Sequence, residues 1–254
     1  NLMKVIYTDN NATTKVADEV IEEMTPYLGQ YYGNPSSMHT FGDQVGKKII
    51  QARQQVADLI NADPDEIVFT SCGTESDNSA IFSALNAHPD RKQIITSTVE
   101  HPAILNLFKF LRDKKGYDAV FVPVDKQGHL NTDMLYDSLS DNTAIVSLMW
   151  ANNETGVIFP IPEIAKKVTE KGILFHTDAV QAVGKIPVDV KAANVDMLAL
   201  SGHKVHAPKG IGVLYVKKGL KFHPYLIGGH QEKGRRGGTE NTVSIIGLGR
   251  ACAL

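Results

Sequence analysis

The chain has 254 residues, of which 43% are hydrophobic and 21% are charged, and its formal net charge at pH 7 is −2. This length predicts one large globular domain, alone or with a small appendage. The near-neutral charge gives no general attraction to nucleic acid or to a membrane, and no apolar run reaches the ~20 residues of a membrane span. We expect no signal peptide at residues 1–9, and with only two cysteines, Cys72 and Cys252, we expect a cytoplasmic protein without a disulfide framework.

Helical patterns cover roughly residues 16–28 and 38–61, and beyond them apolar, strand-like runs alternate with amphipathic stretches. This alternation predicts an α/β fold with a mostly parallel central sheet and helices on both faces. The last two strands are joined by a short loop, so we expect an antiparallel pair at one edge of the sheet. The chain ends in an amphipathic helix for which the sequence suggests no packing partner. The predicted strands are 66–70, 93–98, 119–124, 143–150, 173–178, 195–201 and 211–216, and the helices between them are 75–88, 102–116, 131–140 and 161–172.

Polar side chains follow five of the predicted strands. Ligands of open α/β sheets bind beyond the carboxyl ends of the strands, so we expect these segments to meet at one rim and form a site. The segments are 71–75, 99–101, 151–154, 177–181 and 201–204.

Residues 71–74 join a strand to a helix, and they are small. Their backbone N–H groups and the helix N-terminus favour an anion such as a phosphate, although a simple helix cap made by Ser71 or Thr74 explains the pattern equally well. Neither a Walker loop nor a Gly-x-Gly-x-x-Gly fingerprint is present in the sequence.

Asp178 ends a strand that we expect to be central, where its carboxylate could pair with a buried cationic nitrogen such as a protonated pyridine. A structural hydrogen bond to a neighbouring loop is the alternative. His101 precedes Pro102 at a strand-to-helix junction, where its ring could stack on a flat ligand or transfer a proton near neutral pH. A histidine at such a position can equally be an ordinary hydrogen-bonded side chain.

The segment SGHKVHAPKG (201–210) lies between two apolar strands, so Lys204 is predicted to be buried. A buried amine has a lowered pKa and can condense with an aldehyde to form a Schiff base. The spacing of His203 and His206 is too weak to indicate a metal, and we expect none. An anion cradle, a carboxylate for a ring nitrogen, a flat histidine and a buried lysine are together the parts that pyridoxal phosphate requires.

Eight motifs spread over the chain closely resemble those of the NifS-type cysteine desulfurases, which are pyridoxal phosphate-dependent members of the class V aminotransferases with fold type I, the aspartate-aminotransferase fold. The resemblance runs essentially from end to end. The Cys72–Gly73 pair and the sequences HAPKG and MWANNETG are most similar to the nitrogen-fixation branch. The motifs are DNNATT (9–14), YGNPSSMH (32–39), FTSCGTESDN (69–78), VEHPAI (99–104), MWANNETG (149–156), FHTDAVQAVGK (175–185), SGHKVHAPKGIGVLYV (201–216) and GGHQEKGRRGGTEN (228–241).

The resemblance implies a role for each residue that matches a family position. Lys204 would form the Schiff base and carry protons, and His101 would stack on the pyridine ring and assist proton transfer. Asp178 would pair with the ring nitrogen, and Gln181 would hydrogen-bond the phenolic oxygen. The phosphate would be held by Gly73, Thr74, Ser201 and His203.

Three further residues would act on the substrate or across a subunit boundary. Asn153 would lie by the ring and the substrate carboxylate, and Asn11 would contact the substrate. Thr239 would reach the phosphate of the neighbouring subunit, which implies a homodimer with shared sites. The alternative for residues 228–241, a mobile basic loop that binds nucleic acid, is disfavoured by the near-neutral net charge.

The reaction implied by the resemblance converts L-cysteine to L-alanine and passes the sulfur to an enzyme thiol as a persulfide, for delivery to an iron–sulfur scaffold protein. Selenocysteine lyase activity, aminotransfer on the same fold and a non-catalytic pyridoxal phosphate-binding scaffold are the alternatives.

Family members continue into a small C-terminal domain that carries the persulfide cysteine, and neither Cys72 nor Cys252 is expected to replace it. We therefore expect residues 16–254 to form the large cofactor-binding domain and residues 1–15 to associate with the small domain. On this reading these 254 residues are a fragment, or lack a domain the protein has, or form a short protein that binds cofactor without completing turnover.

Overall fold

The fold is built on one seven-stranded sheet. The computed structural model describes residues 5–254, so part of the predicted segment 1–15 lies outside the described residues. The strand order is β1-β7-β6-β5-β4-β2-β3, which makes β5 the central strand, as predicted for the strand that ends at Asp178. The strands are β1 (Ile67–Thr70), β2 (Gln93–Ser97), β3 (Asp118–Val122), β4 (Thr143–Met149), β5 (Leu174–Asp178), β6 (Met197–Ser201) and β7 (Gly212–Val216).

Strand β7 is the one reversed strand of this sheet. It pairs antiparallel with β6 and also with β1, whereas β2, β3, β4, β5 and β6 pair in parallel. The predicted antiparallel pairing of the last two strands is therefore confirmed, but its predicted place at an edge is wrong. Strand β1, some 140 residues earlier in the chain, forms the edge by pairing with the outer side of β7. The carboxyl ends of β1 and of β2 to β6 consequently lie at the same edge of the sheet.

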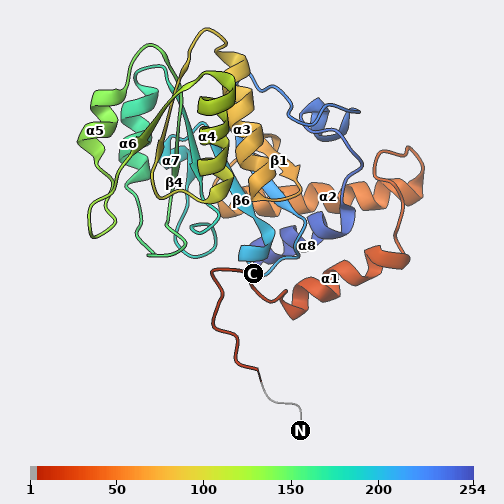
Figure 1. Ribbon diagram of the computed structural model, residues 1–254. Coiled ribbons are helices and arrows are strands. Elements are labelled where there is room, and N and C mark those ends of the chain that lie inside the picture. Colours follow the sequence, from red (N-terminus) through yellow and green to blue (C-terminus); the bar gives the residue numbers. More distant parts are fainter. Residues whose placement is uncertain (1–4) are drawn as a thin grey trace.

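Helices cover the sheet on both faces, as Figure 1 shows. Helices α3 and α4 pack on one face with an apolar cluster that includes Ile81 and Phe108, and α2, α6, α7 and α8 pack on the other. Because both faces are covered, every residue of β4 is buried. Among residues 5–254, no helix has the length and apolar character needed to cross a membrane. The helices are α1 (Asp18–Gly29), α2 (Thr40–Leu59), α3 (Gly73–Ala87), α4 (Pro102–Lys115), α5 (Thr132–Ser138), α6 (Ile161–Thr169), α7 (Val190–Ala193) and α8 (Thr242–Ala253), with short 3₁₀ turns η1 (Pro64–Glu66), η2 (Gly202–Lys204) and η3 (Gln231–Gly234).

The terminal helix α8 has packing partners, contrary to the expectation from sequence. It lies against α2 and α1, and Figure 1 shows the three helices together at one end of the molecule. Glycines allow the close approach: a Cβ added to Gly249 would lie 2.5 Å from the Cα of Ala52, and one added to Gly247 would lie 2.5 Å from the sulfur of Met24. Cys252 packs against the same core.

The outer edge of β1 is capped by charged side chains. The Ile67 carbonyl accepts hydrogen bonds from Arg53 (2.7 Å) and Arg235 (3.0 Å), and the Phe69 N–H donates to Glu232 (3.0 Å). Arg53 also makes a two-pronged ion pair with Glu232. These contacts satisfy an otherwise open strand edge and fasten residues 232–235 to the body of the protein.

Candidate active site

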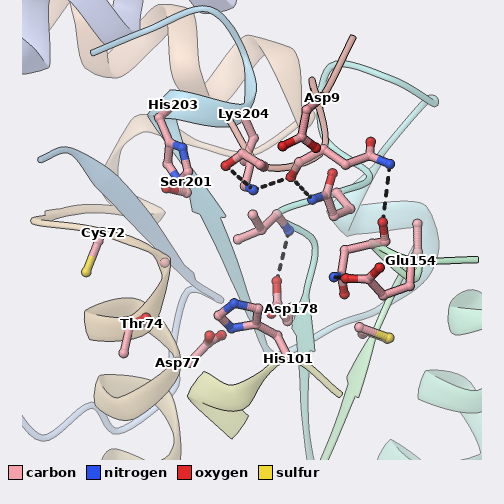
Figure 2. Close-up of a pocket in the computed structure, with 18 residues that line it drawn as sticks. Asp9, Cys72, Thr74, Asp77, His101, Glu154, Asp178, Ser201, His203 and Lys204 are labelled. Atoms are coloured by element: carbon pink, nitrogen blue, oxygen red, sulfur yellow. Dashed lines mark hydrogen bonds between the residues drawn. The ribbon is translucent and has the colours of Figure 1, made fainter. Parts of the chain in front are cut away.

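A pocket of about 500 Å³ opens beyond the carboxyl ends of β1, β2, β4, β5 and β6 (Figure 2). All five strand ends singled out in the sequence contribute to it, because these strands run in the same direction. Ten of the eleven predicted site residues line it. They are Asn11, Gly73, Thr74, His101, Asn153, Asp178, Gln181, Ser201, His203 and Lys204.

Thr239 is the predicted site residue that this pocket does not include. It is exposed and lines a separate hollow of about 220 Å³, next to Gly210 and Asn241. Within a single chain, therefore, the Gly-rich loop lies outside the pocket. The loop itself is held in place, since Arg235 donates to the carbonyls of Asp65 and Ile67.

The start of α3 forms one wall of the pocket. This helix begins at Gly73, two residues earlier than predicted, so Gly73 and Thr74 belong to its first turn, where N–H groups have no intrahelical partner. A Cβ at Gly73 would lie 2.9 Å from the Val180 side chain and 3.5 Å from the Cβ of Ser201, so glycine keeps the wall open. This wall is suited to an anion, because free N–H groups and the positive end of the helix dipole face the pocket.

Lys204 lies in the turn η2 opposite that wall. Its amine donates to the main-chain carbonyls of Asn11 and, at 2.8 Å, of Ala12. The prediction that this lysine is buried on both sides is wrong: the side chain is half-buried, because the segment 11–15 covers one side and the pocket opens on the other. Burial still lowers the pKa of Lys204, and the carboxylates of Asp9 and Asp178 partly oppose this shift.

The floor of the pocket carries Asp178, which is 6% exposed. One of its oxygens accepts the Val180 N–H at 3.0 Å. Burial raises the pKa of Asp178, while that N–H, His101 and Lys204 oppose the shift. A cation placed beside this carboxylate would therefore be strongly favoured.

His101 is the N-cap residue of α4 and lies beside Asp178 in the pocket (Figure 2). Its Nδ1 accepts the Ala103 N–H at 3.2 Å, which puts the proton of the neutral ring on Nε2. The ring is exposed, so one face is available to a flat ligand.

The N-terminal segment links three more of the predicted residues. Gln181 donates to the Asn11 carbonyl at 2.9 Å, and the Asn11 side chain donates to the Asn153 carbonyl at 3.2 Å. His203 contacts Thr13 through Nδ1 at 3.1 Å, and burial lowers the pKa of His203. The segment thus bridges the β4, β5 and β6 sides of the pocket.

Three buried ionisable residues at or beneath the floor were given no role by the sequence analysis, although one of them, Glu100, lies in the predicted rim segment 99–101. Asp77 lines the pocket and lies 3.5 Å from Nε2 of His176, and the carboxyl group of Glu100 is close enough to Asp77 to affect its pKa. Burial raises the pKa of Asp77 and brings the pKa of Glu100 up to about 8, and it lowers the pKa of His176 to about 3. Spacing offered a signal for two of them: Asp77 follows Gly73 by one helical turn, and His176 shares a strand face with Asp178.

The two cysteines differ in position. Cys72 lines the pocket beside Gly73, with its sulfur 3.6 Å from the Ser71 hydroxyl. Burial raises the pKa of Cys252 to about 12, so this thiol stays protonated and is a poor nucleophile.

The residues of the pocket fit pyridoxal phosphate. The volume lies within the roughly 300–1,000 Å³ of small-molecule sites. The glycine-walled start of α3 suits a phosphate, the buried Asp178 suits a protonated ring nitrogen, and the amine of Lys204 suits an aldehyde.

In comparisons with known proteins, the chain is similar to cysteine desulfurases. The chain is 61% identical over 252 residues to a cysteine desulfurase of Trichormus azollae, covering 99% of this chain and 63% of that protein. It is 56% identical to the cysteine desulfurase NifS of Azotobacter vinelandii, covering 98% of this chain and 62% of that protein. The solved structure of SspA in complex with cysteine is similar, with a TM-score of 0.94 at 39% identity, covering 98% of this chain and 72% of that one.

The chain thus spans a little under two thirds of the length of these curated relatives. The family model described as Aminotransferase class-V matches residues 6–254, which is almost all of the sequence. The chain therefore belongs to the aminotransferase class-V family.

Proposed function

We propose that this protein is a cysteine desulfurase, which converts L-cysteine to L-alanine and transfers the sulfur to an enzyme thiol as a persulfide. One observation carries the proposal: the N-terminus of α3, a buried carboxylate and an amine with a lowered pKa converge in one pocket. The relatives named cysteine desulfurase and the SspA complex with cysteine support this choice of substrate.

The cofactor of this family and of its cysteine desulfurases is pyridoxal phosphate. When bound, it supplies an electron sink for bond cleavage at the substrate. The start of α3 would hold its phosphate through Gly73 and Thr74, with Ser201 and His203 completing the cradle. Gln181 would donate to its phenolic oxygen.

Lys204 would bind the cofactor aldehyde and carry protons. Its lowered pKa raises the fraction of neutral amine, which is the nucleophilic form. Nζ must first leave the carbonyls of Asn11 and Ala12, so the N-terminal segment holds the amine in place until a ligand arrives.

Asp178 would keep the ring nitrogen protonated, since an ionised carboxylate in a buried floor gains most from a cationic partner. His101 would stack on the ring and move a proton through Nε2, its remaining free nitrogen. Asn153 and Asn11 would orient the substrate, and their mutual hydrogen bond supports a shared role.

We further propose that the active protein is a homodimer in which Thr239 reaches the partner's phosphate, and that an iron–sulfur scaffold protein accepts the sulfur, with nitrogenase assembly as one use. The exposure of Thr239 outside its own pocket supports the first point. Residues 16–254 would form the large domain and residues 1–15 would associate with a small domain. The two free cysteines fit a cytoplasmic location.

The test of the cofactor site is covalent labelling. The protein is mixed with pyridoxal phosphate, reduced with borohydride, digested and mapped by mass spectrometry. The label should lie on Lys204 and disappear in Lys204→Ala, while Lys185→Ala, which removes the lysine hydrogen-bonded to Gln181, should keep it. A label on Lys185, or one spread over surface lysines, would exclude the assignment.

The substrate is tested separately with the full-length protein. Alanine formation from cysteine, with little from selenocysteine and no transfer to 2-oxo acids, is the expected profile. Preference for selenocysteine would indicate a lyase, and cofactor binding without turnover of any amino acid would indicate a scaffold.

A further inference from the structure

A buried glutamate lies directly behind the predicted phosphate cradle. Glu75 is the third residue of α3, and its side chain is only 8% exposed. One carboxylate oxygen accepts the Ser71 N–H at 2.8 Å, so Glu75 fixes the turn that leads into the cradle. An unpaired carboxylate at this position would repel a phosphate, because both are anions within the same first helical turn.

Arg236 neutralises this glutamate. Its Nε lies 2.9 Å from Oε1 of Glu75 and its Nη2 lies 3.2 Å from Oε2, so the pair is bidentate. Burial favours the protonated acid, but the hydrogen bonds from Arg236 and Ser71 outweigh it, and the pKa of Glu75 is lowered. The carboxylate of Glu75 therefore stays ionised. Among residues 5–254, Arg236 is the only residue that forms an ion pair with it.

The position of Arg236 is itself fixed. The N–H of Gly237 donates to the Leu226 carbonyl at 2.9 Å, and a Cβ at Gly237 would lie 2.6 Å from the backbone of Gly228. This close backbone contact packs the loop against residues 226–228, and the guanidinium of Arg236 reaches Glu75 from a segment 161 residues away in the sequence.

We propose that Arg236 is a positioning residue of the phosphate site: by neutralising Glu75 it lets the N-terminus of α3 bind the phosphate of the cofactor. This inference rests on the proposed function, since it assumes that the phosphate of pyridoxal phosphate binds at Gly73 and Thr74. This role is electrostatic, so Arg236 should affect the binding of ligands that carry a phosphate and should not affect the binding of ligands that have the ring alone.

A second arginine–glutamate pair provides a matched control. Arg53 and Glu232 are also bidentate and largely buried, but Glu232 accepts the N–H of Phe69 within β1 rather than that of Ser71 at the cradle. Neither residue lines the pocket. Loss of this pair should disturb folding to a similar extent while leaving the contact between Arg236 and Glu75 in place.

The experiment measures Kd by absorbance titration with pyridoxal phosphate and with pyridoxal, which lacks the phosphate. In Arg236→Gln, the Kd for pyridoxal phosphate should rise about ten- to hundredfold, and the Kd for pyridoxal should change less than about threefold. Adding Glu75→Gln to this variant should restore binding, because no uncompensated charge remains. Arg53→Gln should bind both ligands within about threefold of the unmodified protein.

Several outcomes would overturn the inference. They are unchanged pyridoxal phosphate binding in Arg236→Gln, equal weakening of both ligands, and a double variant that binds as weakly as the single one. If Arg236→Gln does not fold, Glu75→Gln alone decides, since it should bind pyridoxal phosphate at least as tightly as the unmodified protein and a tenfold loss would refute the charge argument. Failure of the unmodified protein to bind pyridoxal phosphate would instead refute the proposed function.

Discussion

The buried carboxyl group of Glu100 should make the protein less stable as the pH rises from 6 to 8. Glu100 is 3% exposed. Its Oε1 accepts hydrogen bonds from the Ser97 hydroxyl (2.6 Å) and the Met149 N–H (3.0 Å), and its Oε2 has no partner within residues 5–254. Burial raises the pKa of this carboxyl from 4.5 to about 8, with Asp178 adding to the shift.

The sign follows from proton binding. Over this pH range the folded state keeps the proton on Glu100, whereas the unfolded state has already released it. The stabilisation is fully present below the unfolded pKa of 4.5 and is lost as the pH rises through about 8. Linkage gives about 1.4 kcal/mol per pH unit, and about 2 kcal/mol between pH 6 and 8 when both titrations are included.

The variant Glu100→Gln isolates this effect, because it keeps an oxygen acceptor and cannot ionise. Its free energy of unfolding, relative to the unmodified protein, should improve by about 2 kcal/mol between pH 6 and pH 8. Urea unfolding followed by the fluorescence of the buried Trp150 measures this difference. Glu163→Gln, on the exposed side of α6, should give the same difference at both pH values. A relative stability of Glu100→Gln that does not change with pH would refute the reasoning.

Two further substitutions test the buried and close-packed parts of the site. Burial lowers the pKa of His176 from 6.5 to about 3, so this side chain stays neutral in the folded state and stability is lost as the pH falls below 6.5. In urea unfolding, His176→Asn should remove about 2 kcal/mol of the stability loss between pH 6.5 and 4.5. The same stability loss in the variant and the unmodified protein would contradict this. A Cβ at Gly212 would lie 2.6 Å from the backbone carbon of Cys72 and 2.8 Å from the Thr70 hydroxyl. Gly212→Ala should therefore lower the free energy of unfolding by about 1–3 kcal/mol in the same assay and weaken pyridoxal phosphate binding in absorbance titration. Gly29→Ala, whose added Cβ would meet no atom within 4 Å, should change neither.

The location of the site followed from the order of elements in the sequence. Parallel strands end at the same edge of a sheet, so polar residues after five such strands had to meet there. The prediction held because β1, β2, β4, β5 and β6 do run in the same direction. Local apolar patterns identify such strands, and helices in between ensure parallel connections.

The order of strands at the edge could not be predicted in this way. In the pairing of β1 with β7, Ile67 lies opposite Tyr215. A local sequence pattern does not indicate which distant strand pairs with the open edge of a sheet. The burial of Lys204 was overestimated for a related reason. Its flanking strands are buried, but Lys204 itself faces the open pocket on one side and is covered only on the other, by a segment from the far end of the chain.

Buried polar residues were the hardest part to predict. Asp77 and Glu100 are acidic residues in segments that also read as a helix face and a strand end, where exposure is the usual outcome. Their burial close to one another, and the contact of Asp77 with His176, arise from tertiary packing that local spacing does not specify. The ion pair of Glu75 with Arg236 depends in the same way on a contact between residues far apart in the sequence.

The two ends of the pocket have opposite electrostatic preferences, and this fixes the orientation of a ligand. At the α3 end, Arg236 balances Glu75, so the free N–H groups and the helix dipole leave a net preference for an anion. At the floor, Asp178 lies near the carboxyl groups of Asp77 and Glu100, and burial raises the pKa of all three. No arginine or lysine of residues 5–254 forms an ion pair with Asp178, so the floor has a preference for a cation. A molecule with a phosphate at one end and a protonated nitrogen at the other can satisfy both preferences in one orientation only. Lys204 lines the same pocket, so its amine, whose pKa burial lowers, would be the group available to an aldehyde of a ligand held in that orientation.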